Sequence, residues 1–326
     1  MADTFTTSPK TLQQAVQYFS NLDVCQQALV EARWPDGVEC PRCGRTDVAY
    51  LSNQRRWQCK GKHPKRQFSV KVGTIFEDSA IGLDKWFTAI WLIASAKNGI
   101  SSYELARSIG VMQKSAWFML HRIRLAMQTG TFNKLSGDVE VDETYIGGKA
   151  RNMHVARRKR IGMSQHRSML GKVAVVGLLS RHGNDGTSQI RTRVVAGRRK
   201  GHLQPVVREH VESGSAVHTD AHFSYQGLAK DYVHNVIDHA EAYVDGQIHT
   251  NGCENFWSLL KRSIKGTYVS VEPFHLFRYL DEQTFRFNSR KLSDAARFMD
   301  LVSRLTGKRL TYANLIGQEE GAVGLA

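Results

Sequence analysis

Apolar side chains recur at two different spacings along this chain. In the first part they follow the helical period over residues 11–19, 23–32, 83–97 and 114–127. Beyond residue 137, short apolar or alternating runs predict strands instead. The predicted strands are 138–146, 172–180, 189–195, 215–219 and 233–237. Helices at about 254–264 and 275–288 follow, and this succession is typical of an α/β domain whose helices cover a mixed sheet.

Ahead of the α/β region, the chain predicts two helices joined by a short turn. Ser101 and Glu104 match a capping box at the start of a short helix, and Gly110 suits its C-terminal cap. With the helix over 114–127, this gives a helix-turn-helix pattern that could enter the major groove of DNA. The basic residues that lie off the apolar stripe of the second helix are Lys114, Arg122 and Arg124. An ordinary helical hairpin with a basic face fits the same pattern.

Residues 34–76 combine cysteine, glycine and basic residues with short strand-like pieces, so a core of apolar side chains alone is not expected to hold them. Cys40 and Cys43 form a CxxC pair, and Cys59 and His63 form a second pair after a loop of zinc-ribbon length. Four such ligands leave no open position, which predicts a structural Zn²⁺ ion. A redox CxxC pair beside an incidental Cys59 and His63 is the alternative.

The composition of the chain bears on its binding partner and on its location in the cell. The 326 residues include 45 Lys and Arg against 30 Asp and Glu, a net charge of +15 that favours nucleic acid as a partner. Five cysteines are too few and too uneven for a disulfide framework. The polar start of the sequence and the short apolar stretch 86–96 predict neither a secretory signal nor a membrane span. A cytoplasmic, nucleoid-associated protein is expected.

Acidic residues concentrate on the first predicted strand of the α/β region. Alternation places Asp138, Glu140 and Asp142 on one face of that strand, where their mutual repulsion calls for a nearby cation. A solvated edge strand is the alternative. Two more acids stand out: Asp220 ends a buried strand, and Glu254 opens a helix. Each also suits a capping role, Asp220 for the following segment and Glu254 in a capping box with Asn251.

Longer motifs connect these acids to a known family. The chain resembles the bacterial insertion-sequence transposases of the DDE type that carry an N-terminal zinc ribbon. The resemblance covers about residues 23–305. The matching motifs are Trp34-Pro-Asp-Gly-Val-Glu-Cys-Pro-Arg-Cys43-Gly44, Gln67-Phe-Ser-Val, Gly73-Thr-Ile-Phe76, Val141-Asp-Glu-Thr-Tyr-Ile-Gly-Gly-Lys149, His218-Thr-Asp220, His249-Thr-Asn-Gly-Cys-Glu254-Asn-Phe-Trp-Ser-Leu-Leu-Lys-Arg262, Arg278-Tyr-Leu-Asp-Glu282 and Arg286-Phe-Asn.

The resemblance implies an RNase H-like catalytic domain, and it implies that Asp142, Asp220 and Glu254 bind two Mg²⁺ or Mn²⁺ ions. Lys261 is implied as a basic partner on the same helix, and Glu282 with Arg286 as a pair near the site. The implied activity is binding of the element's terminal inverted repeats, strand cleavage by water and attack of the freed 3′-hydroxyl on target DNA. Further basic residues expected to contact DNA are Arg157, Arg158, Lys159, Arg160, Lys261 and Arg262.

Two features depart from the family pattern. The second zinc pair is usually two cysteines, whereas here it is Cys59 and His63. Some relatives use Asn as the third catalytic residue, which makes Asn251 an alternative to Glu254. The expected division is N-terminal helices (1–33), zinc ribbon (34–77), helix-turn-helix region (78–132), RNase H-like domain (133–310) and tail (311–326).

Two other functions would use the same domains. A DNA-binding descendant would keep the ribbon and helix-turn-helix without needing all three acids. A structure-selective nuclease would share the acids without needing the end-binding domains. An active transposase must hold two DNA ends together, so a homo-oligomer, at least a dimer, is expected.

Overall fold

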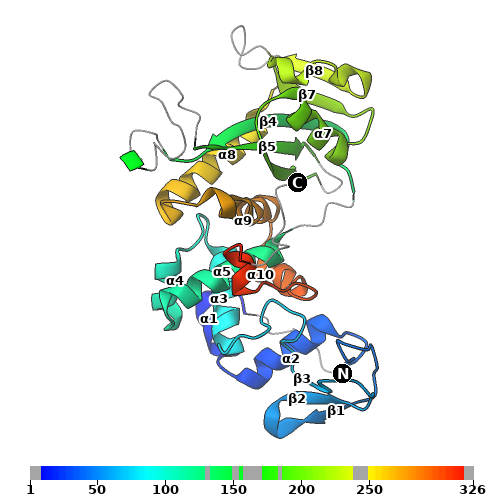
Figure 1. Ribbon diagram of the computed structural model, residues 1–326, viewed down its shortest axis with the longest axis vertical. Helices are drawn as coiled ribbons and strands as arrows, with labels where there is room; N and C mark the ends of the chain where they lie inside the picture. The colour runs from blue at the N-terminus through cyan, green and yellow to red at the C-terminus, as the bar shows by residue number, and fades with distance from the viewer. Residues whose placement is uncertain are drawn as a thin grey trace. The chain divides into compact units, whose positions relative to one another are not determined.

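The computed structural model describes residues 9–128, 133–148, 154–156, 171–182, 186–237 and 249–318. The chain divides into two compact units (Figure 1). The first comprises the residues up to 127 together with the C-terminal segment from Lys291, and the second comprises 128–290. Arg157, Arg158, Lys159 and Arg160, which were predicted to contact DNA, lie outside the described residues.

A five-stranded mixed sheet forms the centre of the second unit. Its strands are β4 (Asp138–Ile146), β5 (Val173–Ser180), β6 (Gln189–Val195), β7 (Ala216–Asp220) and β8 (Val233–Ile237). Their order in the sheet is β6-β5-β4-β7-β8, in which β5 runs antiparallel to β4 and β6, and β7 is parallel to β4 and β8. This order is that of an RNase H-like fold. The mixed sheet predicted from the sequence is confirmed, and each predicted strand is displaced by at most one residue.

Helices cover both faces of this sheet. They are α7 (Lys200–His210), α8 (Asn251–Ser263) and α9 (Leu276–Asn288). One apolar cluster joins Val139 and Val141 of β4 to Leu203 and Val207 of α7. A second cluster joins β5 and β6 to α8 and α9 through Val175, Leu179, Ile190, Phe256, Leu260 and Leu280. Because side chains alternate along a strand, Glu140 and Asp142 face away from α7 and towards α8.

The hydrophobic pattern does not predict α7. Pro205 lies inside the helix, where it removes a backbone hydrogen bond, and few of the other side chains are apolar. The helix forms because Leu203, Val206 and Val207 are buried against the sheet, so tertiary packing outweighs the weak local preference.

The first unit is mainly helical and is built around α3. Its helices are α1 (Leu12–Phe19), α2 (Leu22–Arg33), α3 (Leu83–Ser95), α4 (Ser102–Ile109), α5 (Gln113–Met127), α10 (Asp294–Ser303) and α11 (Tyr312–Leu315). Trp86, Phe87 and Trp91 of α3 are almost fully buried. Within the described part of the chain, no helix combines the length and apolar character that crossing a membrane requires.

The C-terminal segment belongs with this helical unit. The Phe298 ring of α10 lies 6.0 Å from that of Phe87 and 5.3 Å from that of Trp91. The Tyr312 ring of α11 lies 5.7 Å from the Phe118 ring of α5, and Leu315 is buried. This grouping differs from the predicted boundary of the catalytic domain at residue 310. It also shows that the predicted tail begins with an ordered helical turn.

The helix-turn-helix geometry agrees with the sequence, but two of its predicted DNA contacts do not. Ser101 caps α4 by accepting a hydrogen bond from Glu104 N, and Gly110 ends α4 with φ +63°. On α5, however, Arg122 and Arg124 are 6% and 1% exposed. The prediction that these two arginines contact DNA is therefore wrong, because they lie inside the first unit.

Arg122 has a structural role instead. Its Nε donates to Leu310 O at 3.1 Å, and its NH1 donates to Ile75 O at 3.1 Å and Glu77 O at 2.8 Å. Its guanidinium also lies 4.2 Å from the centre of the Phe118 ring. The arginine thus ties α5 to the segment before α3 and to the C-terminal segment. Lys114, by contrast, is exposed near the start of α5.

We expect Arg122→Ala to lower the free energy of unfolding by about 2–4 kcal/mol, because three buried carbonyl groups lose their donor. Lys114→Ala is the control on the same helix and should change stability by at most about 1 kcal/mol, because Lys114 is exposed and its Nζ lies 4.8 Å from the centre of the Tyr312 ring. Urea denaturation followed by tryptophan fluorescence measures both. A stable Arg122→Ala variant with weakened DNA binding would restore the DNA-contact interpretation.

Candidate functional site

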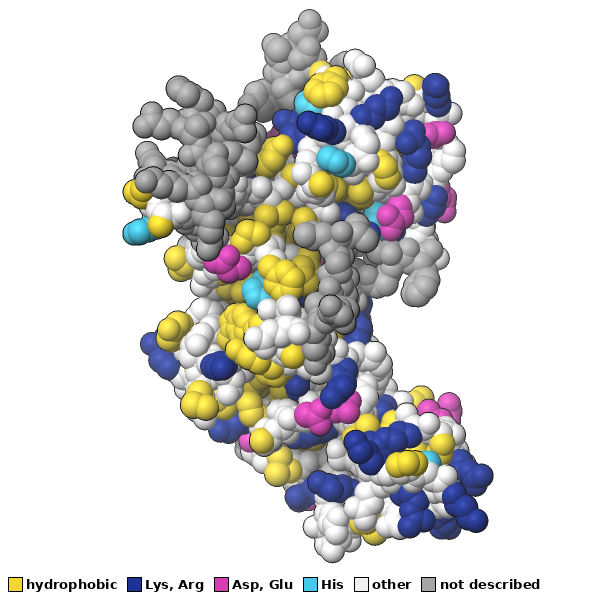
Figure 2. All heavy atoms as spheres, in the orientation of Figure 1, with side chains coloured by type: hydrophobic (Ala, Val, Ile, Leu, Met, Phe, Trp, Pro, Cys, Tyr) yellow, Lys and Arg dark blue, Asp and Glu magenta, His cyan; other side chains and the backbone are white. Residues whose placement is uncertain are grey.

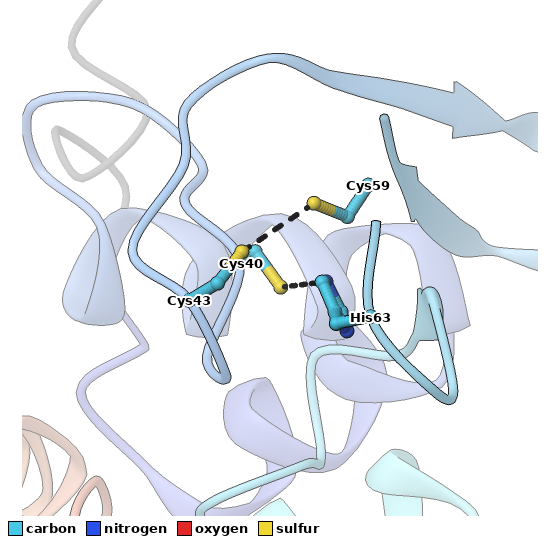
Figure 3. Close-up of side chains that lie close together, drawn as sticks. All are labelled: Cys40, Cys43, Cys59 and His63. Carbon is cyan, nitrogen blue, oxygen red and sulfur yellow. Dashed lines mark hydrogen bonds between the residues drawn. The ribbon is translucent and has the colours of Figure 1, made fainter. Parts of the chain in front are cut away.

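The four predicted zinc ligands meet beside a small antiparallel sheet in the first unit (Figure 3). The sheet consists of β1 (Val48–Leu51), β2 (Arg56–Cys59) and β3 (Gln67–Phe68). Cys40 and Cys43 belong to the turn before it, Cys59 ends β2, and His63 lies in the loop after β2. Their ligand atoms all lie within 4.8 Å of one another.

The spacing of these atoms fits one tetrahedral Zn²⁺ ion. Cys43 Sγ lies 3.6 Å from Cys59 Sγ, and Cys40 Sγ lies 3.5 Å from His63 Nε2. Ordinary zinc bond lengths in a tetrahedron give about 3.8 Å between two sulfurs and about 3.6 Å between sulfur and nitrogen. His63 Nδ1 lies 2.8 Å from Pro64 O, and donation to that carbonyl leaves Nε2 free to bind the metal.

The surroundings favour the metal-binding form of the site. Burial raises the pKa of the Cys40 thiol, but hydrogen bonds from the backbone of Arg42 and Cys43 outweigh burial and lower that pKa to about 7. The thiolate is the form that binds a metal. The ribbon's own apolar core is small and aromatic: the ring centres of Trp34 and Trp57 lie 5.7 Å apart. The site therefore supplies stability that so small a core lacks.

In the second unit, a buried carboxylate fixes the start of α8 on β4. Glu140 is 1% exposed, and its Oε2 accepts a hydrogen bond from Cys253 N at 2.9 Å. Its Oε1 lies 2.7 Å from Arg181 Nε and 3.4 Å from His249 Nδ1. The start of α8 lies so close to Glu140 that a Cβ atom added at Gly252 would be 2.8 Å from Glu140 Oε2. The sequence places Glu140 among the acids but does not reveal this anchoring contact.

Asp142 forms the next contact between β4 and α8. Its Oδ2 accepts a hydrogen bond from Trp257 Nε1 at 2.9 Å, and its Oδ1 accepts one from Glu143 N at 2.8 Å. The Trp257 ring covers Gly177, the residue opposite Asp142 on β5, where an added Cβ would lie 2.7 Å from the ring. Burial, and then repulsion from Glu143 and Asp220, raises the pKa of Asp142 to about 6.

Asp220 ends β7, the strand that runs parallel to β4. The paired register of the two strands ends at Glu140 and His218, and two more residues of the same register would place Asp142 opposite Asp220. The charge of Asp220 is one of the causes that raise the pKa of Asp142. Asp220 Oδ1 also accepts a hydrogen bond from His222 N at 3.2 Å, although His222 rather than Asp220 caps the 3-10 turn that follows.

Glu143, on the opposite face of β4 from Asp142, belongs to a second buried network. Its carboxylate is 1% exposed, pairs with Arg198 and accepts a hydrogen bond from the Tyr225 hydroxyl. Burial, together with the charge of Glu143, raises the pKa of Tyr225 well above its usual value. Arg198 NH2 also lies 3.6 Å from Asp220 Oδ2. Sequence reasoning missed Arg198 and Tyr225, because neither belongs to a recognisable spacing.

Glu254 lies in the first turn of α8, but its side chain is exposed. Thr250 occupies the N-cap position, so the capping box of Asn251 and Glu254, the alternative to a metal-binding role for Glu254, does not form. Lys261 and Arg262 are exposed further along the helix. Among the described residues, the four zinc ligands are the one group of three or more His, Cys, Asp or Glu side chains whose ligand atoms lie close enough together to hold an ion. Glu254 is therefore not gathered with Asp142 and Asp220 in this structure.

The remaining acids have local partners. Asp138 Oδ1 lies 3.0 Å from His218 Nε2. Glu282 is fully buried on α9, where it pairs with Arg286 and accepts a hydrogen bond from the Tyr268 hydroxyl. Tyr268 ends the π-helical turn that follows α8 (Ile264–Tyr268). Glu282 and Arg286 thus hold the C-terminal end of α8 to α9.

A sheet of RNase H-like order, preceded in the chain by a zinc-ligand hairpin, is the architecture expected of a zinc-ribbon transposase, and comparison with known proteins gives this class. Residues 134–288 match the ISXO2-like transposase domain, and residues 21–61 match the transposase zinc-ribbon domain. A protein of the transposable element ISH50 from Halobacterium salinarum is 28% identical over 244 residues, or 72% of this chain and 80% of the relative. A transposase-like protein from Haemophilus influenzae is 30% identical over 105 residues, or 32% of this chain and 85% of the relative. The chain belongs to the family of ISXO2-like transposases.

We expect one Zn²⁺ per chain, lost in Cys59→Ser and in His63→Ala but retained in His63→Cys, which supplies a thiolate at the same place. Cys25→Ala, a change in a cysteine outside the cluster, is the matched control and should keep the metal. Atomic absorption after dialysis measures the zinc content. Full zinc content in His63→Ala would show that the fourth ligand lies elsewhere.

The raised pKa of Asp142 predicts a pH-dependent stability in metal-free protein. The folded state holds the Asp142 proton up to about pH 6, whereas the unfolded state releases it near the ordinary value of 3.8, so stability falls as pH rises between these values. Asp142→Asn removes this penalty. In EDTA, the free energy of unfolding of Asp142→Asn should exceed that of wild type by about 1–3 kcal/mol above pH 6. At pH 4 the two free energies should be nearly equal. Urea titrations at both pH values test this, with the exposed Asp36→Asn as control.

Proposed function

We propose that this transposase binds the terminal inverted repeats of an insertion sequence and catalyses strand cleavage and 3′-hydroxyl strand transfer. The observation that carries the proposal is the pair of carboxylates, Asp142 and Asp220, which lie on the adjacent parallel strands β4 and β7 of the family's transposase domain. Burial, with smaller contributions from the charges of Glu143 and Asp220, raises the pKa of Asp142, and a bound cation would relieve this cost of ionising the carboxyl.

Asp142, Asp220 and Glu254 would hold two Mg²⁺ or Mn²⁺ ions, and carboxylate oxygens fit these hard cations. Bound there, the ions supply activation of the attacking oxygen and stabilisation of the leaving one. Trp257 orients Asp142 through its indole N–H, and Glu140 holds the helix that carries Glu254. Asn251 lies three residues before Glu254 on the same exposed side of α8, so its amide oxygen is the alternative third ligand.

DNA would bind to basic surfaces on both units. Lys261 and Arg262 follow Glu254 on α8, and Lys114 is exposed at the start of the second helix of the helix-turn-helix. Lys and Arg side chains gather over the zinc ribbon (Figure 2). The exposed basic residues of the ribbon include Arg56, Lys65 and Arg66. Such residues suit phosphate contacts, which position DNA without reading its sequence. We further propose assembly as at least a dimer on paired ends, in the cytoplasm and at the nucleoid of a bacterium.

The test is strand transfer in vitro with end DNA, a plasmid target and Mg²⁺. We expect Asp142→Ala, Asp220→Ala and Glu254→Ala to bind ends like wild type but to join them at least about a thousandfold more slowly. Glu209→Ala, which changes an exposed acid on α7, is the matched control and should keep full activity.

Other outcomes would redirect the proposal. Full activity of Glu254→Ala combined with loss in Asn251→Ala would assign the third ligand to Asn251. A wild type that binds ends but joins none with any divalent metal would identify a DNA-binding descendant instead.

A further inference from the structure

Arg198 is a cation placed beside the candidate catalytic acids by a buried network. It lies in the connection between β6 and α7, directly before Arg199, which caps α7. Its Nε pairs with Glu143, whose other carboxylate oxygen accepts a hydrogen bond from the Tyr225 hydroxyl. Its NH2 lies 3.6 Å from Asp220 Oδ2. One guanidinium thus reaches both the buried Glu143 and the candidate metal ligand Asp220.

The network of Arg198, Glu143 and Tyr225 is not explained by its contribution to the stability of the fold. The Glu143 carboxylate is 1% exposed, and the cost of removing a charged carboxylate from water cancels much of what its partners contribute, so a buried ion pair adds little net stability. What the pairing does achieve is orientation. Glu143 and Tyr225 fix the Nε side of a guanidinium whose side chain is still 33% exposed. A fixed and partly exposed arginine is prepared to bind a further anion.

The nature of that anion follows from the charges around the site. Asp142 and Asp220 place negative charge where a DNA backbone would have to approach the proposed site. Arg198 offsets part of this charge, and Arg199 and Lys200 are exposed next to it in the chain. A guanidinium presents five N–H donors in a planar fork that matches phosphate oxygens.

We propose that Arg198 binds a DNA phosphate adjacent to the scissile one, and so positions the strand over Asp142 and Asp220. This inference rests on the proposed function, because it assumes that DNA enters this site. Arg198 then has two partners at once: Glu143 orients it from inside the protein, and the phosphate meets its exposed side.

A methylphosphonate scan tests the contact. A single neutral linkage is placed at each phosphate flanking the scissile one, and end DNA is assayed for binding in Ca²⁺ and for cleavage in Mg²⁺. We expect one position at which the neutral linkage weakens wild type by about 10- to 100-fold in either assay. In Arg198→Ala the same linkage should have almost no further effect, because the contact is already lost. Arg198→Lys should retain part of the sensitivity.

Two variants separate this contact from a folding defect. Arg198→Ala/Glu143→Gln removes the buried charge that Arg198→Ala leaves unpaired, and it should unfold like wild type while keeping the insensitivity of Arg198→Ala. Arg208→Ala removes another α7-region arginine, whose Nε pairs with Asp231 at 2.9 Å, and it should behave as wild type at every linkage.

Each result decides the proposal. Equal effects of every neutral linkage in wild type and in Arg198→Ala would overturn it, since Arg198 would then contact none of these phosphates. Wild type that binds but does not cleave would refute the proposed catalytic function, while the scan in Ca²⁺ would still decide the Arg198 contact. Wild type that does not bind end DNA would overturn both.

Discussion

The docking of α8 on β4 through buried carboxylates is the contact on which the candidate active site depends. Cys253 and Trp257 are one helical turn apart, and they meet Glu140 and Asp142, which are two residues apart on the strand. Four helical residues rise about 6 Å and two strand residues about 6.6 Å, so the two spacings match. The first contact sets the position of the helix, and the second brings Trp257 into contact with Asp142, one of the proposed metal ligands.

The cost of burying Glu140 explains how closely it is surrounded. A buried carboxylate without partners is strongly destabilising, and this one has Arg181, His249 and a backbone N–H from the first turn of α8. The positive end of the helix dipole adds to the same effect. Glu140 thus has a structural role, whereas the next acid on the same face, Asp142, is the one proposed to bind metal. Gly252 and Gly177 permit the close approach, because a side chain at either position would collide with the partner element.

Regular spacing in the sequence makes many elements of the fold and the zinc site predictable. The five strands, the zinc ligands and the helix-turn-helix follow from periodicity, cysteine spacing and caps that lie within a few residues of each other. Side-chain partners that lie far apart in the sequence could not be predicted from such spacings. The sequence suggested that Asp138, Glu140 and Asp142 needed a shared cation, whereas His218 and Arg181 partner the first two. Arg122 and Arg124 looked exposed because they lie off an apolar stripe, but other segments of the same unit cover that side of α5.

We propose that Asp142 and Asp220 bind the catalytic cations together with a residue on the first turn of α8. Anomalous diffraction from crystals of the protein with end DNA and Mn²⁺ would locate these cations. We expect manganese peaks within bonding distance of the Asp142 and Asp220 carboxylates, about 2.2 Å, with Glu254 or Asn251 as a further ligand. Manganese bound away from Asp142 and Asp220, or no manganese in the second unit with DNA in place, would show that these carboxylates do not hold the catalytic metal.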